Sequence, residues 1–267
     1  MPIYKYITNF YISTSIMLSL TIYLALLCQN VESNPGPCTS KAPTLSVLTY
    51  NCNGLGDPKK LKRLLLKLNG MVDRGCIVFL QETHIVNTKY LEMIWKHNVL
   101  SNCVRTNSAG VIILYNKQFD LVYKYADGEG RQLVAVIQND ETKFIIANAY
   151  FPNDHKQGIV FAEQIYTKIL EVQTEYPEHV TFFAGDMNVC LSSSDSINRG
   201  GSQSEVLLSD VIRNNNKVAE LSDSYRSVHA DNGFTWKRGT IYSRLDYIFV
   251  SNAILSKISG ATIDWAF

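Results

Sequence analysis

Several apolar segments of this chain run directly into short clusters of Asn, Asp, Glu and Gln. The oxygens of these side chains are the hard ligands that Mg²⁺ and Mn²⁺ prefer, and one or two carboxylates with water are the usual Mg²⁺ arrangement. One Asp or Asn after a strand is ordinary turn chemistry, but the ordered set predicts a metal-assisted reaction at a phosphate. The clusters are Asn51-Cys52-Asn53-Gly54, Gln81-Glu82-Thr83-His84, Tyr150-Phe151-Pro152-Asn153, Gly185-Asp186-Met187-Asn188 and, inside a strand-like segment, Ser243-Arg244-Leu245-Asp246-Tyr247.

The segments that must position these clusters are rich in β-branched and aromatic residues, which favour strands. Strand ends that carry carboxylates and carboxamides are where α/β proteins build their sites. We expect strands over residues 45–51, 76–80, 110–115, 133–138, 143–151, 180–184, 234–236 and 244–250, with a hairpin turn over 139–142.

Helices are expected between the strands, over residues 57–69, 156–174 and 213–219. In the first of them, Asp57 is a good N-cap, Pro58 suits the first turn and Gly70 is a stop signal. Its leucines share one face, and its basic residues lie mostly elsewhere, which is typical of a solvated surface. Strands alternating with helices predict an α/β or α+β layered sandwich.

The composition is that of an ordinary globular protein, with 46% apolar and 18% charged residues. A net charge of +1 excludes a global basic field, so any nucleic-acid binding must come from a local patch. The six cysteines show no CxxC or Cys/His zinc spacing. We therefore predict free thiols in a reducing compartment.

Three strings carry a resemblance to a known family: Leu80-Gln81-Glu82-Thr83-His84, Gly185-Asp186-Met187-Asn188 and Ser243-Arg244-Leu245-Asp246-Tyr247-Ile248. Together with the other strand-end clusters, they make residues 45–267 similar to the exonuclease–endonuclease–phosphatase superfamily. The apurinic-type endonucleases of LINE-type (non-LTR) retrotransposons are the most similar members. The resemblance implies a four-layer α/β/β/α sandwich. It also implies a Mg²⁺-dependent phosphodiesterase, a hydrolase of ester bonds, that nicks DNA and could also act at abasic sites.

The resemblance also implies a role for each matching residue. Glu82 corresponds to the principal metal carboxylate, with Asn51 beside it and Mn²⁺ as the alternative ion. Asp186 corresponds to the group that orients and deprotonates the attacking water. The remaining catalytic positions are Asn188, which donates to a phosphate oxygen, Tyr150, which stabilises charge near the scissile phosphate, and Asp246, which orients a histidine or shares in metal binding. Substrate contacts are expected from Asn153, Arg226, Trp236 and Lys237.

The chain departs from the family pattern after Asp246. Members of the family end in a strand and a Ser-Asp-His motif whose histidine contacts the scissile phosphate. The five histidines here, at positions 84, 97, 155, 179 and 229, all precede Asp246. We therefore expect a domain truncated before its last strand and last motif, with cleavage much reduced or absent, because loss of a positioned catalytic group costs orders of magnitude in rate.

The first 37 residues differ in composition from the rest. No charged side chain occurs from Tyr11 to Cys28, and this apolar run lies at the lower edge of the length that spans a membrane. The string Val31-Glu32-Ser33-Asn34-Pro35-Gly36-Pro37 resembles the end of a 2A-like ribosome-skipping peptide, although Asn30 replaces the usual Asp. We expect a leader over 1–37, a linker over 38–44 and the endonuclease domain over 45–267.

Alternatives remain open at this point. One is a phosphoesterase of the same fold that acts on an inositol phosphate, a lipid or RNA. Another is a catalytically dead remnant that binds DNA without turnover. The expected partners are DNA and a reverse transcriptase encoded downstream. We expect a monomer inside the cell, nuclear where it acts, unless the leader (1–37) directs it to a membrane or to secretion.

Overall fold

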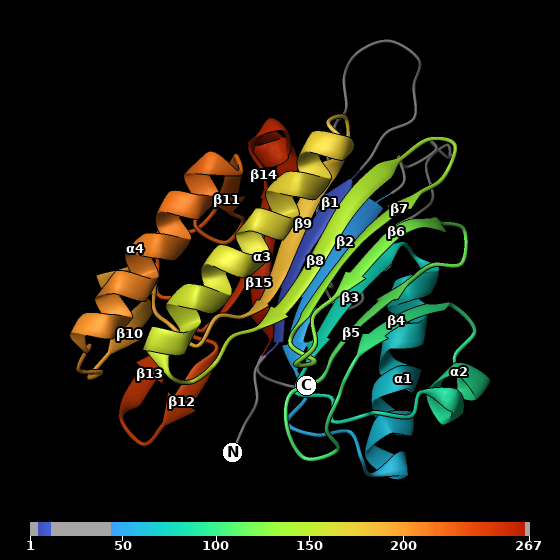
Figure 1. Cartoon of the computed structure of the whole chain (residues 1–267), viewed down its shortest axis with the longest axis horizontal. Coiled ribbons are helices and arrows are strands. Elements are labelled where there is room, and N and C mark those ends of the chain that lie inside the picture. The colour runs from blue at the N-terminus through green and yellow to red at the C-terminus, as the bar shows by residue number, and fades with distance from the viewer. Residues whose placement is uncertain (1–4, 12–43, 265–267) are drawn as a thin grey trace, which may run out of the picture.

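In a computed structural model, residues 5–11 and 44–264 of the chain are described. Two six-stranded sheets pack face to face between outer layers of helices, as Figure 1 shows. The predicted α/β/β/α sandwich is confirmed. We call the sheets sheet I and sheet II. Apolar side chains from both fill the space between them, among them Val47, Phe79, Ile113, Ile146 and Ile248.

Sheet I contains the strands that end in the polar clusters at Asn51 and at Gln81-Glu82. Its order is β15 (Ile258–Asp264), β1 (Lys5–Tyr11), β2 (Thr44–Asn51), β3 (Cys76–Gln81), β5 (Val111–Tyr115) and β4 (Asn98–Asn102). β2 and β3 are parallel, with Asn51 opposite Gln81, so their polar ends lie side by side.

Sheet II contains the strands of the other three clusters. Its order is β11 (Leu221–Asp223), β14 (Asp246–Ser251), β9 (Val180–Asp186), β8 (Lys143–Tyr150), β7 (Gln132–Gln138) and β6 (Asp120–Ala126). β7 and β8 form an antiparallel hairpin. Its turn is closed by a bond from Asn139 N to Thr142 O of 2.9 Å, which confirms the predicted hairpin turn.

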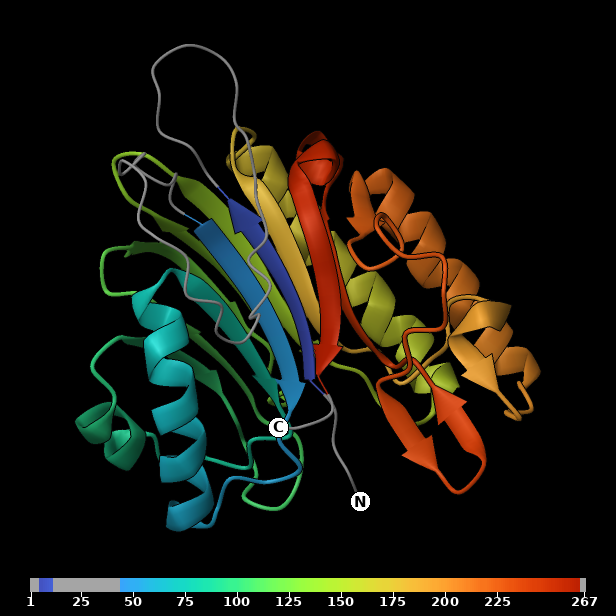
Figure 2. The same ribbon diagram turned by 180° about the vertical axis from the view of Figure 1, so that it is seen from behind.

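Helix α1 (Pro58–Asp73) covers the outer face of sheet I, as Figure 2 shows from behind. The Asp57 side chain accepts a hydrogen bond from Lys59 N, as expected of an N-cap. The predicted stop at Gly70 is wrong, because the helix continues to bury Val72 on the row started by Leu61 and Leu68. The chain turns only at Gly75, whose φ is +89°.

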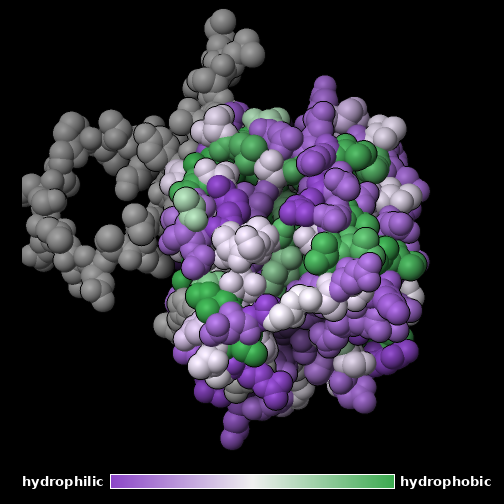
Figure 3. Space-filling view, turned by 90° about the vertical axis from the view of Figure 1, so that its left-hand side faces the viewer, coloured by the Kyte–Doolittle hydropathy of each residue, from purple (hydrophilic) through white to green (hydrophobic). Residues whose placement is uncertain are grey.

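Sheet II is covered by α3 (His155–Glu175) and α4 (Gln203–Val218), which pack on each other and on the sheet. Helix α4 begins ten residues before the predicted position 213, because Ser202 caps it by accepting a bond from Glu205 N of 3.1 Å. Several apolar side chains of α4, Val206, Leu207 and Val218, are exposed. In Figure 3 the apolar areas on this side of the molecule lie among hydrophilic ones.

Helix α2 (Lys89–Ile94) was not predicted, and neither were the strands β4, β6, β11 and β15. A small third sheet of β10 (Ser196–Ile197), β13 (Ile241–Ser243) and β12 (Trp236–Arg238) was also not predicted as a unit. Its β12–β13 hairpin extends from the end of the sandwich at which β2 terminates (Figure 2). The short helices η1 (Ser193–Asp195) and η2 (Asn252–Lys257) complete the described elements.

The N-terminal residues differ from the expected leader in one respect. Lys5–Tyr11 forms β1, which pairs antiparallel with β2 on one side and with β15 on the other. The sheet leaves one strand position between β2 and β15, and the β-branched and aromatic residues of this segment favour the extended backbone that fills it. The apolar run after Tyr11, the 2A-like string and the linker to residue 43 lie outside the described residues, and their functions stay predictions.

Within the described residues, no helix is long and apolar enough to cross a membrane. The four cysteines in this part of the chain, Cys52, Cys76, Cys103 and Cys190, are free, in line with the predicted thiols.

Candidate active site

The site lies where the ends of the two sheets meet. In sheet II, Asp186 is the central residue of a row, since it lies opposite Asp246 on the antiparallel strand β14 and opposite Tyr150 on the parallel strand β8. In sheet I, Asn51 ends β2 and Glu82 follows β3. The Asn51 amide joins the sheets, donating to Glu82 Oε1 at 2.8 Å and to Asp186 Oδ2 at 2.9 Å. Five predicted site residues thus converge.

The backbone around this junction adopts conformations that L-residues rarely take. Asn53, Glu82, His84 and Asn188 have φ values of +45°, +49°, +57° and +51°. Such left-handed residues cost free energy and persist only where the surroundings hold them. Their gathering in the loops after β2, β3 and β9 is typical of a functional site.

The charges of the site are poorly compensated. Burial raises the pKa of Asp186 to about 6; hydrogen bonds from Asn51 and the Asn188 amide oppose this shift, and the Glu82 charge adds to it. Burial, together with the neighbouring Asp186, raises the pKa of Asp246 well above its usual range. Asp246 Oδ1 is buried and has no hydrogen-bond partner within the described residues. Three carboxyl groups are therefore gathered here, and none of them forms an ion pair with a Lys or Arg of the described residues.

This donor set fits a divalent cation. No group of three or more His, Cys, Asp or Glu among the described residues is arranged to hold a metal directly. An ion here would bind through one or two carboxylates and water, which is the arrangement that Mg²⁺ favours. The Asn51 amide oxygen would join them only after the amide turns over, because its nitrogen faces both carboxylates. The unpartnered Asp246 Oδ1 and the raised pKa of Asp186 are what a site built for added positive charge would leave.

Tyr150 faces the same carboxylates. Its hydroxyl makes a hydrogen bond to Glu82, and burial, with Glu82 and Asp186, raises its pKa above the usual range. The Tyr150 phenol is therefore neutral and able to donate a hydrogen bond. Asn188 was expected to donate to a phosphate, but here its Nδ2 donates to the Phe151 carbonyl at 2.7 Å. One hydrogen of that amide remains for another acceptor.

A buried polar layer lies behind Glu82. Gln81 Nε2 donates to Asn148 Oδ1 at 2.7 Å and to Thr49 Oγ1 at 3.0 Å. Asn148 Nδ2 in turn donates to the carbonyls of Leu80 and Ile112. Gln81, Asn148 and Thr49 are fully buried, so the layer fixes the end of β3 against sheet II.

A second group of buried charges lies beside the site. Asp195 Oδ1 accepts from Arg244 Nε at 2.8 Å and also from Arg226, while Arg244 Nη2 reaches Asp223 at 2.6 Å. Burial alone would raise the pKa of Asp195, but the Arg244 and Arg226 guanidinium groups outweigh it and hold the pKa below its usual range. We call Asp195, Arg226, Arg244 and Asp223 the ion-pair cluster. It anchors the segment that leads into Asp246.

The predicted substrate-binding residues lie on three separate segments of the chain. Asn153 is exposed in the loop after β8. Arg226 belongs to the ion-pair cluster and also bonds to the Asp231 carbonyl. Trp236 and Lys237 are half-buried in the β12–β13 hairpin, and Lys237 lies 4.8 Å from the centroid of the Tyr242 ring. Their substrate contacts stay predictions.

Sequence reasoning missed four residues that support the site. Thr235 Oγ1 accepts from the amides of Leu245 and Asp246, and Lys60 Nζ donates to the carbonyls of residues 52–54 beside Asn51. Arg131 lies over the Tyr150 ring, and Asp195 anchors the ion-pair cluster. No local signal marks Lys60 or Arg131. The string that contains Thr235 was noted only for its aromatic and basic members.

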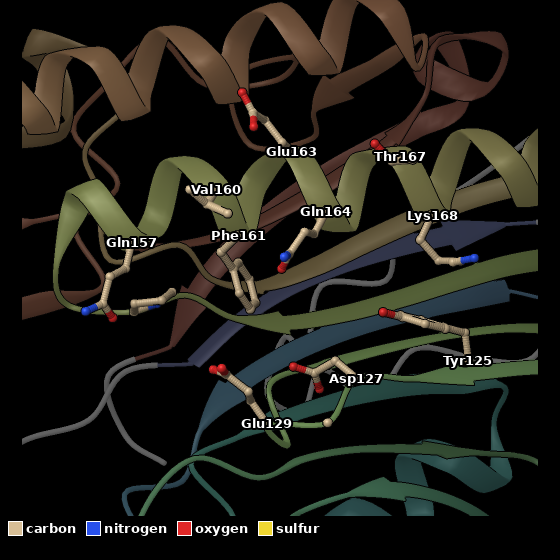
Figure 4. A pocket seen from close by; sticks show the side chains of 12 residues that line it. Tyr125, Asp127, Glu129, Gln157, Val160, Phe161, Glu163, Gln164, Thr167 and Lys168 are labelled. Atoms are coloured by element: carbon tan, nitrogen blue, oxygen red, sulfur yellow. The ribbon is translucent and has the colours of Figure 1, made fainter.

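A groove of about 820 Å³ lies beside α3 and does not contain the carboxylates. Figure 4 shows Tyr125, Asp127 and Glu129 on one wall, and Gln157, Glu163 and Lys168 of α3 on the other. Pro152 links it to the loop after Tyr150. The groove and the carboxylates at the sheet junction are therefore separate features of the surface.

Comparisons with known proteins agree with this geometry. A family model described as the endonuclease/exonuclease/phosphatase family matches residues 48–266. An AP endonuclease from Archaeoglobus fulgidus superposes with a TM-score of 0.62 at 16% identity, over 79% of this chain and 88% of that one. The Xenopus laevis APE2 catalytic domain gives 0.61 at 17% identity, over 79% and 83%.

Two further solved structures extend the comparison. A Neisseria 3′ phosphatase, NExo, bound to a product DNA hairpin gives a TM-score of 0.57 at 21% identity, over 79% of this chain and 88% of that one. For Caenorhabditis elegans TDP2 the score is 0.56 at 18% identity, over 78% of this chain and only 63% of TDP2. At these identities the likeness concerns the fold.

Proposed function

The chain belongs to the endonuclease/exonuclease/phosphatase family, and we propose that it hydrolyses phosphodiester bonds of DNA with the help of a divalent metal ion. The observation that carries the proposal is the pair of hydrogen bonds from Asn51, which hold Glu82 and Asp186 together at the junction of the sheets. DNA is the proposed substrate because structural neighbours include AP endonucleases and a 3′ phosphatase bound to a DNA hairpin.

Each residue of the site has a step in the proposed reaction. Glu82 and Asn51, with Asp186 adjacent, would hold Mg²⁺, which when bound supplies positive charge to the phosphate and to the leaving oxygen. Asp186 takes the proton of a water molecule whose oxygen bonds to phosphorus. The bond from phosphorus to the 3′ oxygen breaks, and that oxygen takes a proton from solvent. The products are a 3′ hydroxyl and a 5′ phosphate.

Two residues hold the reacting phosphate in this proposal. Tyr150 donates its hydroxyl hydrogen, and Asn188 donates the amide hydrogen that Phe151 does not use. Donors fixed before the reaction stabilise developing negative charge without reorganising. Asp246 lies opposite Asp186 and is buried, so it has no direct contact with the phosphate in this proposal.

A nicking assay tests the proposal. We expect the full chain to convert supercoiled plasmid to the open circle slowly in Mg²⁺, because no histidine of the described residues contacts Asp246. Glu82→Ala or chelation of the metal should abolish nicking. Glu163→Ala, which removes an exposed carboxylate of α3, is the matched control. Hydrolysis of an inositol phosphate or a lipid in place of DNA would refute the assignment.

A second candidate is DNA binding without turnover. It is favoured by Asp246 Oδ1, which is buried with no partner in the described part of the chain and so lacks the group it would orient. Salt-dependent DNA binding by a protein that never nicks, with or without Mg²⁺, would support this candidate.

The finer assignment is also a proposal. We infer a retrotransposon endonuclease that acts in the nucleus, together with a downstream reverse transcriptase, from the strings around Glu82, Asp186 and Asp246 and from the 2A-like leader. Expression of the reading frame with tags on both sides of Pro37 tests the leader. Two separate products would support ribosome skipping, and a single fused product would exclude it.

A further inference from the structure

Arg131 holds Tyr150 through three separate contacts. The Tyr150 amide donates to the Arg131 carbonyl at 2.9 Å. The Arg131 guanidinium donates from Nη1 to the Tyr150 carbonyl at 3.1 Å. The same guanidinium lies over the Tyr150 ring, with Cζ 4.7 Å from the ring centroid. The backbone contact is ordinary for neighbouring strands, but the two side-chain contacts fix both ends of one tyrosine.

The turn that presents Arg131 is built to be rigid. Asp127 Oδ1 accepts from the amides of Arg131 and Gln132, each at 2.9 Å, and from Asn102 Nδ2 at 2.6 Å. Gly130 has a φ of +75°, and a Cβ there would lie 2.9 Å from Val104 N. Only glycine suits this position. The guanidinium is therefore aimed before any substrate arrives.

The same turn is joined to the loop of Glu82. The Gly110 amide donates to the Gly130 carbonyl at 2.9 Å, and the Gly110 carbonyl accepts from Thr83 N at 3.0 Å. A Cβ on Gly110 would lie 2.6 Å from Thr83 Oγ1, so these backbones approach closely. Tyr150 and Glu82 are thus both located relative to the turn that carries Arg131.

Arg131 also differs from Arg199, whose charge influences Asp186. Arg199 is already engaged, with Nη2 3.0 Å from Glu205 Oε1 and Nη1 3.1 Å from Ser243 Oγ. Among the described residues, no carboxylate oxygen of an Asp or Glu lies within 4.0 Å of an Arg131 guanidinium nitrogen. Its charge acts on the Tyr150 ring, as a cation over an aromatic face.

We propose that Arg131 is a positioning residue that fixes the Tyr150 ring, so that the phenol hydroxyl stays beside Glu82 and meets the substrate phosphate. This inference rests on the proposed hydrolysis for the identity of that phosphate. A tyrosine free to rotate would still be present but would miss the phosphate oxygen. Misplacement of a catalytic group by about 1 Å costs on the order of a hundredfold in rate.

A double-mutant cycle tests whether Arg131 acts through Tyr150. We expect Arg131→Met to lower kcat for nicking by about tenfold to a hundredfold, with KM much less affected. In a Tyr150→Phe background the same substitution should cost less than about threefold, because the hydroxyl it positions is gone. Arg131→Lys should recover part of the loss, since the cation over the ring returns. Lys124→Met, an exposed lysine of β6, is the control.

Two results in this cycle would overturn the inference. Equal losses from Arg131→Met with and without the Tyr150 hydroxyl would mean that Arg131 acts independently of Tyr150. A change in KM alone would mean that it merely attracts the anionic substrate.

A spectroscopic measurement tests the same inference without activity. With 3-fluorotyrosine placed at position 150, Arg131→Met should shift the ¹⁹F resonance, because the stacked guanidinium is lost, while Lys124→Met should not. An unchanged resonance in Arg131→Met overturns the inference even in an active enzyme. A shifted resonance in a protein that never nicks supports the contact and refutes the proposed hydrolysis, so the two failures can be told apart.

Discussion

Two neighbouring groups of carboxylates in this protein differ in whether arginine side chains are paired with them. At the sheet junction, Glu82 and Asp186 accept hydrogen bonds from the neutral Asn51 amide, and Asp246 Oδ1 has no partner among the described residues. In the ion-pair cluster, Asp195 is bound by two arginines and is fully buried. Burial by itself favours a higher pKa in both places. The pKa of Asp186 is indeed raised, but that of Asp195 is lowered because the two arginines outweigh the effect of burial.

The difference separates what the fold needs from what the reaction needs. A buried carboxylate with its cation present stabilises the structure around it, or at least does not strain it. A buried carboxylate without one is costly, and a protein retains it where a ligand will supply the charge. We therefore expect the first group to serve the reaction and the second to stabilise the fold, although Asp186 and Asp195 are only nine positions apart.

The largest effect should come from neutralising the unpaired group. Asp186→Asn should lower the nicking rate by about 10²–10⁴-fold, because the general base is lost. The free energy of unfolding should stay the same or increase, since a buried charge disappears. Plasmid nicking and urea denaturation measure the two quantities. A marked loss of stability would place Asp186 with the architectural charges and break the comparison.

The same change in the ion-pair cluster, Asp195→Asn, should mainly lower the stability of the fold. Asp195→Asn leaves Arg244 and Arg226 without their shared carboxylate, and loss of one partner of a buried pair costs about 3–5 kcal/mol. Urea denaturation gives the change in the free energy of unfolding. The matched control is Asp210→Asn, which removes an exposed ion pair with Arg213 and should change stability little. Equal effects from both variants would argue against a structural role for the cluster.

Divalent ions should stabilise the protein only where the unpaired carboxylates are ionised. The folded pKa of Asp186 is raised from 3.8 to about 6, so its ionisation destabilises the metal-free fold as the pH rises through that window. Millimolar Mg²⁺ should raise the melting temperature by about 3–8 °C at pH 7.5 and by less at pH 5. Asp186→Asn should remove most of the difference. An ion effect independent of pH would point to binding elsewhere.

The smallest expected effect is the pH dependence of the nicking rate, which tests whether Asp186, unlike Asp195, takes part in the reaction. Asp186 must be ionised to accept a proton, and its pKa of about 6 lies within the working range. With Mg²⁺ bound the pKa of Asp186 should lie lower than in the metal-free protein, because the ion favours the carboxylate. The rate should fall about tenfold for each pH unit below that lowered pKa and level off above it. Rates from pH 5 to pH 8 at saturating Mg²⁺ measure this. A flat profile would mean that another group takes the proton.

The sequence predicted the residues whose position follows from a strand end. Asn51, Glu82, Tyr150 and Asp186 each lie at the end of a strand or directly after one, and such ends meet at one edge of a sheet. The Asp57 cap was predictable because capping is local. The continuation of α1 through Gly70 was not, because the burial of Val72 against the sheet outweighs the helix propensity of one glycine.

The supporting residues could not be predicted for a related reason. Asp195 contacts Arg244, which is 49 positions away in the sequence, and both lie outside the long strands. Arg131 is recognisable only once its turn is packed against Tyr150. Arg226 was predicted to contact substrate, and its engagement with Asp195 depends on the same tertiary contacts. Charge type alone did not distinguish a structural arginine from a positioning one.

The place of β1 in sheet I has a consequence for the order of folding. β15 pairs with β1 alone, so the last described strand reaches the sheet only through the first. The pairing of Lys5 with Asp264 joins residues that are 259 positions apart, and contacts of such high contact order form slowly. As the chain leaves the ribosome, β1 can pair with β2 early, but its other edge must wait for β15. Until residues 258–264 have left the ribosome, that edge stays open to strands of other chains.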